Sequence, residues 1–129
     1  MSRVVVMKFG GASVASPESF DRVADIIIAR GASHSQIAVV VSAMGDTTDE
    51  LISLAKKVNP DPPRREMDML ITVGERISIA LLAMALAKKG VVAKSFTGSQ
   101  SGIVTSHEHT GARIADVKPH RLLKTFNDG

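Results

Sequence analysis

Two short apolar runs constrain the fold more than any other feature of this sequence. Residues 36–42 read Gln-Ile-Ala-Val-Val-Val-Ser, and residues 4–7 read Val-Val-Val-Met. Near-continuous runs of β-branched residues are typical of strands that are buried on both faces, as in a parallel sheet covered by helices. The sequence therefore predicts a parallel sheet that contains both segments.

Helical patterns separate these two strands and follow them. Ser16, Pro17 and Glu18 form a strong helix start, with a capping side chain, a proline in the first turn and an acid near the N-terminal end. The predicted elements are helices at 16–30, 46–58, 65–89 and 119–126 and further strands at 91–96, 103–105 and 112–117. This order predicts an α/β fold, a three-layer α/β/α sandwich with a mainly parallel sheet, here incomplete.

The third predicted helix is unusually apolar. Its longest apolar stretch, residues 77–87, contains Ser78 and is too short to span a bilayer. Residues 80–86 are nevertheless too apolar for a surface helix. We expect them to be covered by another subunit or by chain outside this sequence.

Composition narrows the classes of partner. The chain has 129 residues, no cysteine and only 3% aromatic residues, and its net charge is +3. Few aromatic side chains are available to stack on bases, and there is no dense basic run, so no nucleic-acid partner is expected. With no signal peptide or spanning segment in view, the expectation is a cytoplasmic protein without a membrane partner.

The end of the first strand is suited to hold phosphate. Lys8 is followed by Phe9 and then by Gly10 and Gly11. Glycine lets backbone N–H groups approach an anion closely, and the lysine adds a mobile positive charge. A double glycine after a strand is, taken alone, more often a plain turn. Neither the Walker order nor the dinucleotide fingerprint is present.

Other polar residues follow the second strand and lie within the long helix. In open α/β sheets, ligands bind at the carboxyl ends of the strands, where Ser42 and Thr48 are expected. Glu75 lies in the middle of the third predicted helix. Each has a plainer interpretation: Ser42 ends a strand, Thr48 caps a helix, and Glu75 belongs to a solvated helical face.

The histidines do not predict a metal site. His107 and His109 are separated by one residue, a spacing that two ligands in a loop can share. The chain has no cysteine and no acidic cluster at ligand spacing. They are interpreted as loop histidines, and no metal-ligating residue is predicted.

Taken together, the motifs resemble those of the aspartokinases, within the amino acid kinase family. The resemblance covers almost all of the chain and keeps the order and spacing of the family. The matching stretches are residues 8–14, 41–51, 74–78, 95–102 and 112–114. It implies transfer of the ATP γ-phosphoryl group to the side-chain carboxylate of L-aspartate, the first step of lysine, threonine and methionine biosynthesis.

The resemblance also implies a role for each candidate residue. Lys8 is the catalytic residue, and Lys8, Gly10, Gly11 and Ser42 bind the ATP phosphates. Thr48 and Glu75 contact the aspartate, with Glu75 suited to its α-ammonium group. Mg²⁺ is expected with ATP, held largely by phosphate oxygens and water. A homo- or hetero-oligomer is expected.

The sequence departs from the family in two respects. Position 12 is Ala, where the family usually has Thr or Ser, so one hydroxyl is missing from the glycine loop. The chain is also short. Residues 1–129 are expected to form the N-terminal portion of the catalytic domain, without its nucleotide-binding half and without the regulatory ACT domains.

Two alternatives remain. The chain is an inactive truncated fragment that binds only substrate or a partner subunit, with its apolar helix as the contact. Alternatively, it belongs to another amino acid kinase, such as an acetylglutamate or uridylate kinase. Those enzymes share the Lys-Gly-Gly strand end, but they are not expected to carry residues 42–51 together with residues 74–78.

Overall fold

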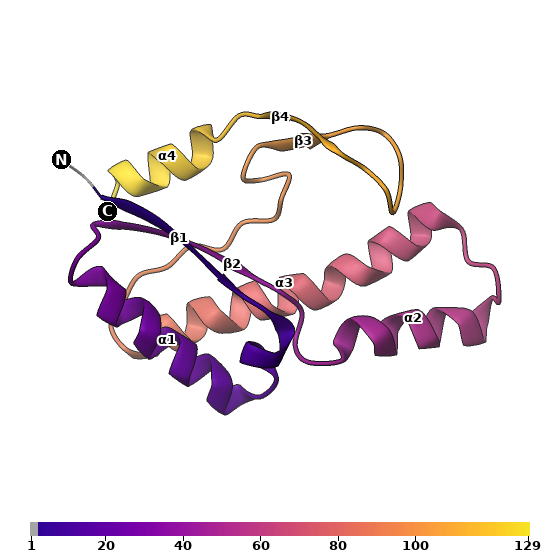
Figure 1. The fold of residues 1–129 in the computed structure, drawn as a ribbon, viewed down its shortest axis with the longest axis horizontal. Helices are drawn as coiled ribbons and strands as arrows, with labels where there is room; N and C mark the ends of the chain where they lie inside the picture. Colours follow the sequence, from indigo (N-terminus) through magenta and orange to yellow (C-terminus); the bar gives the residue numbers. More distant parts are fainter. Residues whose placement is uncertain (1–2) are drawn as a thin grey trace.

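The structure is a computed structural model that describes residues 3–129. Figure 1 shows the path of the chain through its helices and strands. In chain order the elements are β1 (Val4–Phe9), the 3₁₀ helix η1 (Gly11–Val14), α1 (Pro17–Gly31), β2 (Gln36–Val41), α2 (Thr47–Val58), α3 (Arg64–Lys88), β3 (Ile103–Thr105), β4 (Ile114–Val117) and α4 (His120–Asn127).

The predicted parallel pairing is confirmed. Strands β1 and β2 run parallel, in a register that extends from Val4 opposite Gln36 to Phe9 opposite Val41. Both strands therefore end at the same edge, which is where the candidate phosphate site was expected. Strands β3 and β4 form a separate antiparallel hairpin with an irregularity between Val104 and Thr105.

The start of α1 is specified locally, as the sequence predicts. The Ser16 side chain accepts a hydrogen bond from the Ser19 N–H, and the Ser19 side chain accepts one from the Ser16 N–H. This reciprocal arrangement is a capping box with Ser in place of the usual Glu or Gln. Pro17 occupies the first turn. The helix entrance that follows β1 is therefore fixed by its own sequence.

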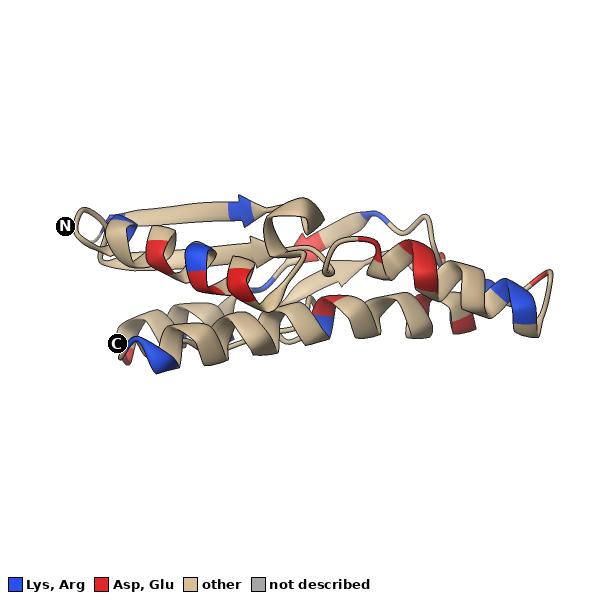
Figure 2. Ribbon diagram, turned by 90° about the horizontal axis from the view of Figure 1, so that it is seen from below, with Lys and Arg blue, Asp and Glu red and all other residues tan. Residues whose placement is uncertain are grey.

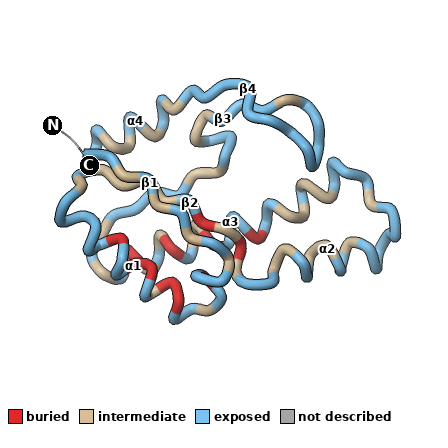
Figure 3. Tube along the Cα trace, viewed as in Figure 1, coloured by how far each residue is buried: buried red, intermediate tan, exposed pale blue. Residues whose placement is uncertain are grey.

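The core lies between α1, α3 and one face of the sheet. Figure 3 shows the buried segments gathered on α1, on the end of β2 and on α3. The buried side chains that contact one another are Val14, Phe20, Val23, Ala24, Ile27, Val41, Leu82 and Leu86. At one end, the Lys89 ammonium group pairs with Asp25 at 2.9 Å and with Asp21 at 3.3 Å, which joins α1 to the end of α3.

The prediction that both faces of the strands are buried is wrong for the described residues. Burial alternates along β1, and the opposite face of the sheet is open: Val6 is 67% exposed and Val40 is 52% exposed. Helices α1 and α3 cover only the other face. A run of β-branched residues is typical of a strand whose two faces are both packed against other elements. Within residues 3–129, helices pack against one face of the sheet only.

The predicted strand at residues 91–96 is also wrong. These residues form no ladder with another strand in the described chain. The N–H of Val91 donates instead to the Leu86 carbonyl, and Gly90, at φ +82°, completes the end of α3. Val92 is 89% exposed. A strand requires a hydrogen-bonding neighbour, and the apolar pattern cannot tell whether one is present.

The third predicted helix is confirmed as α3, at Arg64–Lys88. Figure 2 shows few charged positions between its two ends. It is long and apolar enough, by length and composition alone, to cross a membrane, so the argument from the length of residues 77–87 does not hold for the whole helix. Core helices of soluble proteins pass the same test. Leu82 and Leu86 are buried here, whereas Met84 is 64% exposed.

Candidate active site

Backbone hydrogen bonds join the ends of β1 and β2. The Ser42 N–H donates to the Phe9 carbonyl at 3.1 Å, which continues the sheet by one residue. The Gly45 N–H donates to the Gly11 carbonyl at 3.0 Å. The segment that follows β2 is thereby held against the glycine pair that follows β1, and two of the predicted phosphate-binding segments lie side by side.

Gly11 is required at this junction because of a close backbone approach. A Cβ added to Gly11 would lie 3.0 Å from the Ala43 carbonyl oxygen and 3.2 Å from that of Gly45. Carbonyl oxygens of the backbone cannot move aside as a flexible side chain can. Gly45 itself has φ +45°, in the left-handed region that favours glycine. The two glycines together make the turn between β2 and α2 fit onto β1.

Gly10 differs from Gly11 because it faces open space. A Cβ at Gly10 would meet no atom within 4 Å, and the residue is exposed. Its carbonyl accepts the Ser13 N–H at 3.0 Å in the first turn of η1. A ligand can therefore reach the backbone at Gly10 without displacing protein atoms.

Lys8 lies on the open face of the sheet. Side chains alternate along a strand, so Lys8 shares this face with Val4 and Val6, and its register partner is the exposed Val40. Lys8 is exposed and takes part in none of the ion pairs of residues 3–129. Its positive charge is available to an anion near the end of β1.

A second group forms where α3 crosses the start of α2. Gly74 is buried, and a Cβ placed on it would lie 3.1 Å from the Ala43 Cβ and 3.2 Å from the Thr47 Cγ2. Only a residue without a side chain allows the two helices to come this close. Thr48 and Glu75 are the next residues along each helix, so this contact brings the two predicted substrate residues to one region.

Ala43 connects both groups and was not singled out from the sequence. Its carbonyl oxygen faces Gly11, and its Cβ faces Gly74. Ala43 is 5% exposed. The signal in the sequence was weak, namely a small residue directly after a strand. Through Ala43, the turn after β2 contacts both the glycine pair after β1 and the middle of α3.

Two surface grooves lie beside α2. One runs along α2 past Asp49, Ser53 and Lys57, and the other lies between α2 and α3 near Pro62 and Met67. Neither is lined by the candidate site residues. At Gly10 the junction faces open space.

Comparison with known proteins assigns the family. Residues 3–129 match the amino acid kinase family. Among curated proteins, the chain is 53% identical over 126 residues to the aspartokinases of Mycolicibacterium smegmatis and Corynebacterium glutamicum, and 48% identical to that of a Bacillus species. Each match covers 98% of this chain. The chain spans only about a third of the length of these relatives, 30% or 31%.

Solved structures agree on the fold. Aspartate kinase from Synechocystis is similar with a TM-score of 0.77 and 41% identity, over 93% of this chain and 20% of that one. Escherichia coli aspartokinase III in complex with aspartate and ADP has a TM-score of 0.81 and 22% identity, over 99% of this chain and 39% of that one. Residues 3–129 thus have an α/β fold that corresponds to part of an aspartokinase. The chain belongs to the amino acid kinase family.

Proposed function

We propose that this chain is the part of an aspartate kinase that orients the ATP phosphates and L-aspartate. The observation that carries the proposal is the junction around Ala43, where the glycine pair after β1, the turn after β2 and Gly74 of α3 meet. The similarity to aspartokinases over 98% of the chain supports it. In the reaction, a side-chain carboxylate oxygen of aspartate bonds to the γ-phosphorus, the bond from that phosphorus to the bridging oxygen breaks, and ADP leaves.

The phosphate side of the proposed site consists of Lys8, Gly10, Gly11 and Ser42. Phosphoryl transfer is catalysed mainly by positioning and by neutralising charge on the phosphate oxygens. Lys8 would supply a positive charge from the open face of the sheet. The accessible backbone at Gly10 and the hydroxyl of Ser42 would supply orienting contacts. Lys8 is the residue that we assign to catalysis, because the charge it can neutralise is on the transferred group.

The aspartate side consists of Thr48 and Glu75. Glu75 is exposed, whereas Thr48 is half-buried. A carboxylate is suited to the α-ammonium group of an amino acid, and a hydroxyl can bond to a carboxylate. The contact of Gly74 with Thr47 places both residues near the turn that also holds Gly11. This arrangement supports a substrate whose amino end and reacting end are bound by different elements.

Mg²⁺ fits this proposal as a companion of ATP and not as a metal bound by protein alone. Residues 3–129 contain no group of three His, Asp or Glu side chains arranged to hold a metal ion. Mg²⁺ prefers to keep several waters and to bind substrate phosphates. When bound, it neutralises charge on the β- and γ-phosphates. Lys8 would then share that task from the protein side.

We propose that residues 1–129 are the N-terminal portion of the catalytic domain. The nucleotide-binding half and the ACT domains then belong to the remaining two thirds of the relatives' length. The open face of the sheet and the exposed apolar side chains of α3, among them Met84, would be covered by that chain or by another subunit of an oligomer. A cytoplasmic enzyme of lysine, threonine and methionine synthesis is the corresponding biological role.

The competing proposal is a fragment that binds aspartate or a partner without turnover. The incomplete cover of the sheet favours it for the 129-residue chain on its own. The test is aspartate-dependent ADP release with Mg-ATP in a coupled assay, applied to the full-length natural protein that contains residues 1–129 and to these residues alone. We expect activity from the full-length protein and none from residues 1–129. An inactive full-length protein, with ATP and aspartate both saturating, would refute the kinase assignment.

A further inference from the structure

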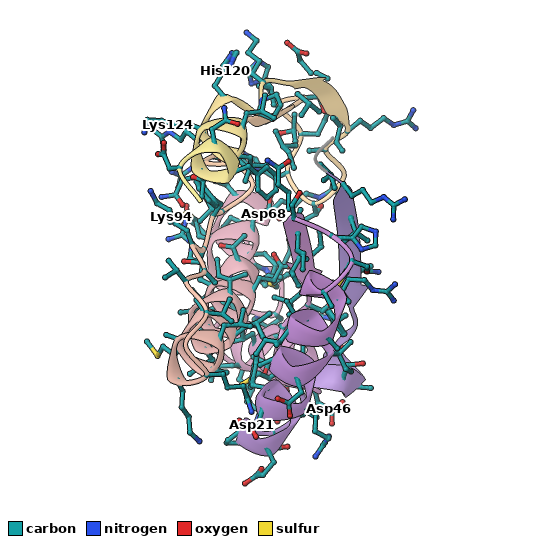
Figure 4. All side chains as sticks on the ribbon, turned by 90° about the vertical axis from the view of Figure 1, so that its left-hand side faces the viewer. Asp21, Asp46, Asp68, Lys94, His120 and Lys124 are labelled. Atoms are coloured by element: carbon teal, nitrogen blue, oxygen red, sulfur yellow. The ribbon has the colours of Figure 1, made fainter. Side chains whose placement is uncertain are left out.

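The tip of the β3–β4 hairpin is attached to α3 through one carboxylate. The Oδ2 atom of Asp68 accepts a hydrogen bond from the Thr110 N–H at 3.0 Å and lies 3.2 Å from Nδ1 of His109. These contacts join segments 41 and 42 residues apart. Figure 1 shows the hairpin tip beside the N-terminal half of α3. In Figure 4, Asp68 is labelled between α4 at the top of the view and Asp21 near the bottom.

The backbone of Thr110 is strained. Its φ is +63°, and no other residue of 3–129 except glycines has a positive φ. This left-handed region is unfavourable for a β-branched residue, and such a conformation persists only where the surroundings impose it. The N–H of this same residue donates to Asp68. The contact with α3 therefore sets the shape of the tip against the local preference of the chain.

The other hydrogen bonds near the tip are internal to the hairpin: the Ser106 N–H donates to the Arg113 carbonyl at 2.9 Å, and the Arg113 N–H donates to the Ser106 Oγ at 3.0 Å. All residues of β3 and β4 are exposed, and the two strands pair only with each other. At the base, the Lys118 N–H donates to the Gly102 carbonyl at 2.8 Å, and a Cβ on Gly102 would clash with the Lys118 carbonyl oxygen. The base is thus closed by its own residues, and Asp68 anchors the opposite end.

The anchor lies on the same side of α3 as Glu75. The two residues are seven positions apart, which is nearly two helical turns, so their side chains project in almost the same direction. The separation along the helix axis is about 10 Å. The hairpin tip is therefore held on the face of α3 that carries the residue proposed to bind the aspartate amino group.

We propose that Asp68 is a positioning residue for the amino-acid side of the reaction. It holds the β3–β4 hairpin against α3, so that the hairpin bounds the space next to Glu75. This inference rests on the function proposed above. Asp68 does not itself touch the substrate in this assignment. Its effect is on aspartate binding and not on ATP, because the hairpin tip lies on the Glu75 face and not at the glycine junction.

The test is a set of variants of the full-length natural protein that contains residues 1–129. Asp68→Ala should raise the KM for aspartate about three- to tenfold, the effect of losing one or two hydrogen bonds, with the KM for ATP unchanged. Asp68→Asn keeps an oxygen that can accept the Thr110 N–H and should recover most of the loss. Glu66→Ala is the matched control, because Glu66 lies on the same helix, is exposed and, within residues 3–129, forms an ion pair only with Arg65.

A second readout separates positioning from general destabilisation. Hydrogen exchange at the Thr110 amide should become faster in Asp68→Ala and stay unchanged in Glu66→Ala. His109→Ala, in an exposed loop, should shift the aspartate KM in the same direction by a smaller factor. An unchanged Thr110 exchange rate, or equal changes in both KM values, would overturn the inference. If Asp68→Ala does not fold, His109→Ala provides the test: a higher KM for aspartate with an unchanged KM for ATP supports the inference, and equal changes in both KM values overturn it.

Different experimental results would refute the positioning role of Asp68 and the proposed kinase function. A parent protein that releases ADP on addition of aspartate, with Asp68→Ala kinetically normal, refutes the positioning role alone. A parent without aspartate-dependent ADP release refutes the kinase assignment, and the positioning role for that reaction falls with it.

Discussion

Gly74 of α3 lies so close to Ala43 that a Cβ added to the glycine would be 3.1 Å from the Cβ of the alanine. This approach holds the long helix against the turn that follows β2. The same turn is hydrogen-bonded to the glycine pair after β1. The turn after β2 therefore contacts both the glycine pair on the proposed phosphate side and the helix that carries Glu75.

Gly74→Ala should reduce stability. Alanine in a helix interior is favoured over glycine by about 1 kcal/mol, whereas overpacking in a tight interior costs about 1–3 kcal/mol. The Cβ of Ala43 is bonded directly to the backbone and cannot rotate away from the new methyl group. We therefore expect the cost of overpacking to exceed the gain in helix propensity. Urea unfolding of the variant measures the difference.

Two further variants test whether the loss of stability in Gly74→Ala is caused by the clash of the added Cβ. Gly98→Ala should leave stability almost unchanged, because a Cβ at Gly98 would meet no atom within 4 Å. Adding Ala43→Gly to Gly74→Ala should restore part of the lost stability by removing one of the two clashing atoms. A Gly74→Ala protein that is more stable than the parent would show that the turn can move aside.

Lys8→Ala should lower kcat by two or more orders of magnitude, with a smaller change in either KM. The removed charge acts on the transferred phosphoryl group, so its loss is felt mainly in the transition state. Lys94→Ala is a suitable control, since Lys94 is an exposed lysine outside the proposed site whose ammonium group lies 5.9 Å from the ring centroid of Phe96. Near-normal turnover of the Lys8 variant in steady-state kinetics would remove Lys8 from the catalytic role.

Glu75→Ala should raise the KM for aspartate strongly and leave the KM for ATP nearly unchanged. The substrate ammonium group would lose its charged partner, and charged hydrogen bonds are stronger than neutral ones. Glu75→Gln should recover only part of the affinity. Equal losses for both substrates would assign Glu75 a structural role in α3 instead.

The hairpin provides a prediction about pH. A hydrogen bond from the Ser106 side chain, together with one from its own backbone N–H, holds the pKa of the Glu108 carboxyl below its usual 4.5. A depressed folded-state pKa stabilises the folded hairpin above the unfolded value, and this contribution is lost as the pH falls through the folded value. A carboxyl-carbon NMR titration should place the midpoint below 4.5 in the parent. Ser106→Ala should return it toward 4.5.

The helices were the most predictable part of the fold because their signals are local. Ser16 and Pro17 specify the start of α1 within four residues, and the three prolines after Asn59 separate α2 from α3. The strand expected at residues 91–96 failed because strand formation depends on a neighbour that the local pattern does not contain. The prediction that both faces of the sheet are buried was wrong for a similar reason, because the local pattern does not show which elements pack against a strand.

The candidate site was predictable in part. Gly11 and Ser42 come together because parallel strands end at one edge, which is a general rule of topology. The contact of Gly74 with Ala43 depends on how α3 packs against the turn after β2, and no spacing in the sequence encodes it. The contact of Asp68 with Thr110 joins segments 42 residues apart and was not foreseen.

The central claim is that the phosphoryl group moves from ATP to the side chain of aspartate, and this can be measured directly. Acyl phosphates react with hydroxylamine, so aspartyl hydroxamate should accumulate when the full-length protein is incubated with Mg-ATP, L-aspartate and hydroxylamine. We predict hydroxamate in proportion to ADP, none without aspartate, and a rate of hydroxamate formation at least about a hundredfold lower with Lys8→Ala. ADP release without hydroxamate would mean that water accepts the phosphoryl group, and would contradict the account.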